Sequence, residues 1–185
     1  VTGLRGPLRC AAALGVAALT LAGAACRKAP PRRALEVLVP FLPATLDPFA
    51  DSRLVSRSIF TALYESLAEE SAYGSRPAVA ESWTNPSPDT WAFRISAAAR
   101  FHDGSPVTSR DVVDAARASR AARGSLAGLA DLKAIEVVDV RTVRFVTHGP
   151  AEDFLLTVSL LFISRREGDV WQGTGPFRVV ARAPD

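Results

Sequence analysis

Four acidic side chains are the residues of this sequence best suited to acid–base chemistry: Glu65, Glu81, Asp103 and Asp111. A pair of carboxylates is the catalytic apparatus that most glycosidases use. Nothing in the spacing of these four forces two of them together, and we expect Glu65 to face solvent on a helix. An exported hydrolase is therefore the least favoured of the functions that the sequence allows.

Two further segments resemble chemical motifs but fit them poorly. His102 lies in a His-Asp-Gly turn, and the chain has only two histidines, too few for a multi-histidine metal site. Gly173 and Gly175 begin a phosphate-loop pattern, but Arg178 stands where its third glycine would be. We interpret these glycines as a place where the backbone passes close to another segment. The sequence predicts no catalytic residue, no metal and no cofactor, and hence a protein that is not an enzyme.

Cys26 predicts a different kind of chemistry, the attachment of a lipid. Arg5 and Arg9 precede an apolar run from Cys10 to Ala25 that ends in small residues, as in an export signal. A cysteine directly after those residues resembles a bacterial lipobox, although Gly23 stands where leucine is usual. We expect a signal peptide over 1–25, cleavage before a lipidated Cys26, and a tether over 26–34. An ordinary secretory signal and an uncleaved membrane anchor are the alternatives.

Charge excludes one class of partner. The chain has 22 basic and 19 acidic residues, and removal of the signal leaves 20 against 19, a net charge of about +1. The short basic cluster beside Cys26 lies in the proline-containing tether. We therefore expect no nucleic acid as a partner.

The elements that would position any site follow from periodicity. Apolar residues recur every four positions from Ser52 onward and predict a helix, and Trp91, Phe93 and Ile95 alternate as in a strand. Thr108 and Asp111 form a capping-box pattern that predicts a second helix. Further expected elements are a strand over 35–39, a loop over 85–89, a hairpin about Asp139–Arg141, a short helix after Pro150 and a strand over 177–181.

Seven landmarks in sequence order resemble family 5 of the bacterial extracellular solute-binding proteins. They are Leu46–Pro48, Leu63–Leu67, Pro77–Trp83, Trp91–Ile95, Phe101–Thr108, Asp111–Val113 and Gly173–Phe177. The resemblance covers about residues 35–181. It implies an α+β fold with a mixed sheet and peripheral helices, the first lobe of a type II periplasmic-binding-protein-like fold.

The resemblance also implies a function without covalent chemistry. The protein would be the substrate-binding lipoprotein of an ABC importer, with a peptide or other small solute and a membrane permease as partners. Nickel complexes, sugars and opines are other ligands within the family. It would work in the periplasm or at the extracellular face of the cytoplasmic membrane, held there by its lipid anchor.

Family members are several hundred residues long and close two lobes around the ligand. We therefore expect residues 35–185 to form a partial lobe without the second one, and to bind peptides weakly or not at all. The same reasoning predicts exposed apolar surface near Leu160–Ile163 and Phe177. A lipid-tethered interaction module without a ligand of its own is the runner-up function.

The resemblance places one ligand-binding segment in this chain. In peptide-binding members, the residues shortly after Leu-Asp-Pro run along the ligand backbone. By position these are Asp51, Ser52, Arg53 and Leu54. The alternative is that Ser52 simply caps the helix that follows.

Overall fold

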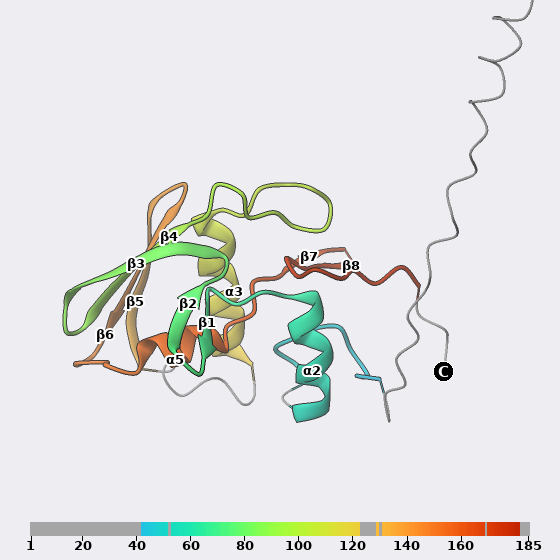
Figure 1. Cartoon of the computed structure of the whole chain (residues 1–185), viewed down its shortest axis with the longest axis horizontal. Helices are drawn as coiled ribbons and strands as arrows, with labels where there is room; N and C mark the ends of the chain where they lie inside the picture. Colours follow the sequence, from blue (N-terminus) through green and yellow to red (C-terminus); the bar gives the residue numbers. More distant parts are fainter. Residues whose placement is uncertain (1–41, 52, 123–128, 130, 169, 182–185) are drawn as a thin grey trace, which may run out of the picture. The chain divides into compact units, whose positions relative to one another are not determined.

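The computed structural model describes residues 42–51, 53–122, 129, 131–168 and 170–181 (Figure 1). Cys26, the expected signal and tether, and the strand predicted over 35–39 lie outside these residues. Among the helices of the described part of the chain, none is long and apolar enough to cross a membrane.

Helices and short antiparallel sheets make up the described chain. In order they are α2 (Leu54–Leu63), β1 (Ala68–Ser71), β2 (Gly74–Pro77), β3 (Ala80–Ser87), β4 (Thr90–Ile95), α3 (Ser109–Ala121), β5 (Leu132–Asp139), β6 (Thr142–Thr147), α5 (Phe154–Ser159), β7 (Arg165–Glu167) and β8 (Val170–Gln172). The α+β class is confirmed. In the described residues all strand pairs are antiparallel, whereas we expected a mixed sheet.

A four-stranded sheet of order β3-β4-β6-β5 carries the main core. Alternation places Trp91, Phe93 and Ile95 of β4 on the buried face, as predicted. Phe93 contacts the ring of Phe145 on β6, and Phe145 lies 5.3 Å from the ring of Phe154 on α5. We call this buried cluster the sheet core; its central members are Trp91, Phe93, Ile95, Val143, Phe145 and Phe154.

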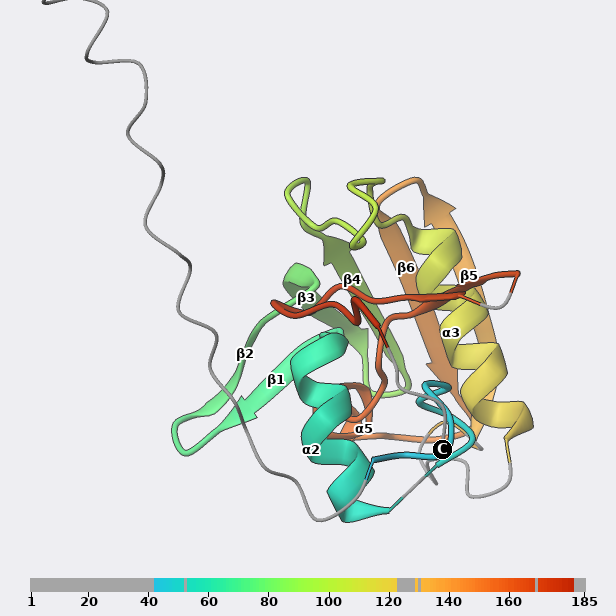
Figure 2. The ribbon, with the colours of Figure 1, turned by 90° about the vertical axis from the view of Figure 1, so that its right-hand side faces the viewer.

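Helix α3 lies across β5 and β6 (Figure 2). Its start is the predicted capping box, in which Asp111 Oδ2 accepts hydrogen bonds from the backbone N–H and the hydroxyl of Thr108. Val112, Ala115 and Ala116 on its inner face are buried. The predicted β5–β6 hairpin about Asp139–Arg141 and the short helix after Pro150 are also confirmed.

The loop predicted over 85–89 is largely wrong. Strand β3 continues through Asn85 and Pro86 to Ser87, with an irregular register between Thr84 and Ser87. Proline is tolerated there because β3 is an edge strand, where a missing N–H donor breaks no ladder. A turn-forming composition therefore does not exclude an edge strand.

A second, smaller core forms around α2. Phe60, Leu63, Tyr64 and Phe162 are buried together, with Leu46, Ile59 and Trp171 packed against them. We call this set the α2 cluster. It corrects the expectation of exposed apolar surface at Leu160–Ile163, because Leu161, Phe162 and Ile163 are at most 4% exposed. Phe177 is exposed as expected.

Candidate functional site

Residues 173–177 cross the end of α2 and are hydrogen-bonded to three other segments, residues 62–65, His102 and Ile163. We call residues 173–177 the strap. The Gly175 and Phe177 N–H groups donate to the carbonyls of Leu63 and Ala62. The Glu65 N–H donates to the hydroxyl of Thr174, which in turn donates to the Ile163 carbonyl. The strap is therefore held by hydrogen bonds and not by a sheet, and the strand predicted over 177–181 does not form.

The two glycines of the strap are required by close approach, as the sequence indicated. A Cβ at Gly173 would lie 2.1 Å from the Leu63 carbonyl oxygen, and one at Gly175 would lie 2.6 Å from that of Ala62. Both obstacles are backbone atoms, which cannot rotate away. Only glycine fits at either position without a shift of the strap or of α2.

His102 also binds the strap. Its backbone N–H donates to the Gly173 carbonyl, and the Gly173 N–H donates to the ring Nδ1 at 3.3 Å. The ring Nε2 lies 3.0 Å from the Gly175 carbonyl oxygen. Because Nδ1 accepts a hydrogen bond it carries no proton, so the proton is on Nε2, which donates to Gly175.

The turn that carries His102 is itself fixed by an arginine of β7. Arg165 contacts the carboxylates of Asp103 at 3.0 Å and Asp111 at 3.8 Å, and its guanidinium lies 4.4 Å above the Phe101 ring. Hydrogen bonds from the hydroxyl and N–H of Ser105, together with Arg165, hold the pKa of Asp103 below its usual range. Gly104 has a φ of 87°, as the predicted tight turn requires.

The Leu-Asp-Pro loop, residues 46–48, is anchored on the α2 cluster. The Tyr64 hydroxyl donates to the Leu46 carbonyl at 2.6 Å. Burial, together with the charge of Asp47, raises the pKa of Tyr64 well above its usual range, so the hydroxyl stays protonated as a donor. Asp47 closes its own turn by accepting from the Phe49 N–H.

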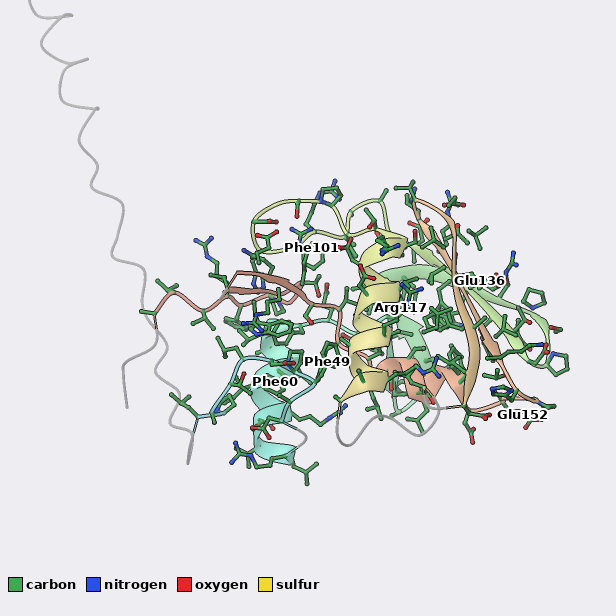
Figure 3. All side chains as sticks on the ribbon, turned by 180° about the vertical axis from the view of Figure 1, so that it is seen from behind. Phe49, Phe60, Phe101, Arg117, Glu136 and Glu152 are labelled. Atoms are coloured by element: carbon green, nitrogen blue, oxygen red, sulfur yellow. The ribbon has the colours of Figure 1, made fainter. Side chains whose placement is uncertain are left out.

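Trp171 on β8 lines two grooves beside this loop. A groove of about 590 Å³ is lined by Leu46, Trp171, His102 and the chain after the strap. A second, of about 450 Å³, has Phe49, Ala50 and Trp171 on one side and the alanines Ala118, Ala121 and Ala122 on the other. Figure 3 shows Phe49 between α2 and α3, where it borders this groove, and Phe60 on α2 itself. The first groove also has polar side chains in its wall, Asp103, Gln172 and Arg178, whereas the second is mostly apolar. Concave surfaces of this size that combine apolar walls with a few polar groups suit small ligands.

Of the four predicted ligand-binding residues, three are described. Asp51 bridges to Arg53 and accepts from the Ser56 hydroxyl at 2.6 Å; these bonds, that to Arg53 foremost, hold its pKa far below its usual range. Arg53 is exposed, and Leu54 is 83% exposed. Ser52 lies outside the described residues. The helix begins after Arg53, and Asp51 accepts the Arg53 N–H.

The four carboxylates considered for hydrolysis do not form a free pair. Asp103 and Asp111 share Arg165, and Glu81 contacts Arg94 and Arg141. Glu65 follows α2 and is half-buried, so the expectation that it faces solvent on a helix is wrong. Burial, with a smaller contribution from Glu69, raises its pKa.

Sequence reasoning missed Trp171 and the role of His102. Neither has a periodic pattern around it, since both lie in short or irregular segments. The available signal was the pair Gly173 and Gly175, which indicates that the backbone passes close to another segment but does not indicate which segment. Only the fold brings His102, Trp171 and the Leu-Asp-Pro loop to one place.

Comparison with known proteins places these features in a family context. The sequence matches the bacterial extracellular solute-binding proteins, family 5 (middle), over residues 75–185. Among solved structures, OppA from Burkholderia pseudomallei is 25% identical with a TM-score of 0.63, covering 76% of this chain and 34% of that one. No curated protein matches the sequence.

Two further structures show the same fold. The murein tripeptide binding protein MppA from Escherichia coli is 23% identical with a TM-score of 0.66, covering 76% of this chain and 34% of its own. DppA from Helicobacter pylori, in complex with the peptide STSA, is 21% identical with a TM-score of 0.63 over 75% and 35%. The chain therefore spans about a third of the length of the structures it matches.

Proposed function

Because this chain belongs to family 5 of the bacterial extracellular solute-binding proteins, we propose that it is a substrate-binding component of an ABC importer and that its solute is a peptide. The match over residues 75–185 carries this proposal. Two of the similar structures support a peptide in particular: one is a murein tripeptide binding protein and the other a DppA bound to the peptide STSA. The grooves on either side of Trp171 would form part of the wall against which the solute rests.

The mechanism needs positioning and not covalent chemistry. The strap and the Leu-Asp-Pro loop hold Trp171 and Leu46 at the groove, where an aromatic ring offers rigid apolar contact area at low entropic cost. Arg53 and Leu54, exposed at the start of α2, are the proposed continuation of this wall along the peptide backbone. Capture and hinge closure would then deliver the solute to the permease.

The three tryptophans of the chain provide a direct test with internal controls. A mixed pool of di- to pentapeptides, added to millimolar concentration, should shift the indole N–H NMR signal of Trp171. The signals of Trp83 and Trp91 should stay in place, because Trp91 donates its indole N–H to the Ala151 carbonyl within the sheet core. Calorimetry should show no micromolar affinity for this chain. Shifts in the sheet core alone, or none at Trp171, would contradict a peptide site at the groove.

Lipid attachment at Cys26, a signal over 1–25 and a tether over 26–34 complete the proposal. They would hold residues 35–185 at the outer face of the cytoplasmic membrane. Expression in a bacterium should give a membrane-associated product whose N-terminal mass includes a diacylglycerol group. Cys26→Ala should release the protein from the membrane, whereas Cys10→Ala, at the only other cysteine, should leave it bound. Equal behaviour of the two variants would contradict lipidation at Cys26.

A lipid-tethered interaction module is the second candidate, favoured by one observation. Phe177 and Val180 are 65% and 89% exposed and lie in one segment that forms no strand. Apolar side chains in that setting are typical of surfaces that another protein covers. Retention of a permease in a pull-down, equally with and without peptide, would favour this candidate over solute capture.

A further inference from the structure

His102 uses both ring nitrogens to hold the strap, and the two bonds have opposite directions. Nδ1 accepts from the Gly173 N–H, and Nε2–H donates to the Gly175 carbonyl at 3.0 Å. Such an arrangement accepts one tautomer of the neutral ring. The cationic ring has a proton on both nitrogens, so it would turn an N–H toward the N–H of Gly173.

We propose that His102 is a pH-sensitive latch on the strap: the neutral ring holds residues 173–175 in place, and protonation of the ring frees the Gly173 N–H and loosens the strap beside the adjacent groove. The inference goes beyond solute binding and does not depend on which solute the groove takes.

Release would reach the groove because His102 both holds the strap and lines the groove, and because the residues on either side of the strap line it too. His102 and the residues that follow the strap, Arg178 to Ala181, line the groove of about 590 Å³ together with Trp171. Within the part of the chain that the structure describes, no strand pairs with the strap to hold it when a latch bond breaks. Its remaining bonds are those to the carbonyls of Leu63 and Ala62, those of the Thr174 hydroxyl with Glu65 and Ile163, and the backbone bond from the His102 N–H to the Gly173 carbonyl.

Charged groups near His102 come from its own turn and from the groove. Asp103, in the same turn, is paired with Arg165 at 3.0 Å. Arg178 lines the groove together with His102. The Tyr64 ring, at the end of α2, lies beside Gly173 as the His102 ring does, and the Tyr64 hydroxyl stays neutral. The charge of Asp47, in the Leu-Asp-Pro loop, contributes to the raised pKa of Tyr64.

The bond that protonation would break is the neutral hydrogen bond from the Gly173 N–H to Nδ1, which is 3.3 Å long. Loss of one or two such bonds corresponds to roughly a tenfold change in a local opening equilibrium. The expected effect is therefore a local opening of the strap, and not unfolding of the sheet core.

The test follows the two histidines of the chain, His102 and His148, by NMR between pH 7.5 and 5.5. At pH 7.5 the ring of His102 should show a proton on Nε2 and none on Nδ1. On acidification, the Gly173 amide should shift with the same midpoint as the His102 ring, and its corrected exchange rate should rise roughly tenfold. The Trp171 indole signal should move with them.

Two variants separate the latch from general acid effects. His102→Asn should abolish the pH response of Gly173, whereas His148→Asn, at an exposed residue, should leave it unchanged. A proton on Nδ1 at pH 7.5, a Gly173 amide that ignores the His102 titration, or an equal loss of response in both variants would overturn the proposal. The first two results come from the unmodified chain, so they stand even if His102→Asn does not fold.

Discussion

The sheet core and the α2 cluster are both buried, but they are built in different ways. The sheet core depends on side chains that alternate along neighbouring strands, such as Phe93 and Phe145, and that meet across antiparallel pairs. The α2 cluster is closed by the strap, through single hydrogen bonds and two glycines. The first region is held by many redundant contacts, and the second by a few irreplaceable ones. Regions of the second kind open more easily and are where ligand-responsive elements are found.

The largest effect should come from the centre of the sheet core. Phe93→Ala removes a fully buried ring that contacts Trp83, Trp91, Phe145 and Phe154. We expect the free energy of unfolding to fall by about 3–5 kcal/mol, as for other buried phenylalanines. Tyr73→Ala, at a fully exposed ring, should change it by less than about 0.5 kcal/mol. Denaturant titration of both variants checks the contrast; similar values would show that the sheet core does not carry the stability.

A smaller, local effect is expected at the strap. Gly173→Ala puts a Cβ against the Leu63 carbonyl, and we expect a cost of about 1–3 kcal/mol, the usual range for overpacking. Gly149→Ala is the matched control, because nothing lies within 4 Å of its Cβ position. Thermal unfolding midpoints compare the two variants. A Gly173→Ala protein as stable as Gly149→Ala would mean that the crossing is not close.

Tyr64→Phe tests the anchor of the Leu-Asp-Pro loop. The variant keeps the ring of the α2 cluster and removes the hydroxyl that donates to Leu46 at 2.6 Å. The Leu46 carbonyl loses its donor, so we expect a loss of about 1 kcal/mol, measured by denaturant titration. The Trp171 indole NMR signal should shift as well, because Leu46 and Trp171 line the same groove. An unchanged Trp171 signal would mean that the position of the Leu-Asp-Pro loop does not affect the groove.

The smallest effect on stability is expected from a substitution at Glu65, and it should be a gain where the other substitutions cause a loss. The pKa of Glu65 is raised in the folded state, so folding binds protons and its ionisation destabilises the fold as pH rises above the ordinary carboxyl range. Glu65→Gln should therefore stabilise the protein at pH 7, by less than about 1 kcal/mol, and have no effect near pH 3.5, where the carboxyl is protonated in both states.

Glu152→Gln is the control for that substitution. Glu152 is exposed at the far end of the molecule from α2 (Figure 3) and should change stability at neither pH. Stabilities measured at pH 7 and 3.5 decide between the two. Destabilisation by Glu65→Gln at pH 7 would mean that its carboxylate has a favourable partner.

Segments with a periodic pattern were predictable from the sequence, whereas the contacts between segments distant in the sequence were not. The alternation at Trp91, Phe93 and Ile95 and the capping box of Thr108 are local patterns, and both appear as predicted. Strand β3 was not predicted, because Pro86 disfavours a strand everywhere except at an edge, and edge position depends on the whole sheet.

The candidate site was predictable only in part. The family resemblance pointed to Asp51–Leu54, and this assignment stays a prediction. Trp171 and His102 enter the site through contacts over more than 60 residues of sequence, which no local pattern encodes. The strand expected over 177–181 failed for a similar reason: in the described residues no strand pairs with this segment, and a local sequence does not reveal the absence of a partner.

Amide hydrogen exchange of the unmodified chain tests the central contrast most directly. The amides of β4 and β6 should exchange only by global unfolding. Those of Gly175 and Phe177, bonded to Leu63 and Ala62, should exchange at least tenfold faster through local opening, since a few hydrogen bonds hold them. Equal protection of the strap and the sheet would contradict the account, because the strap would then belong to the same cooperative unit as the sheet core.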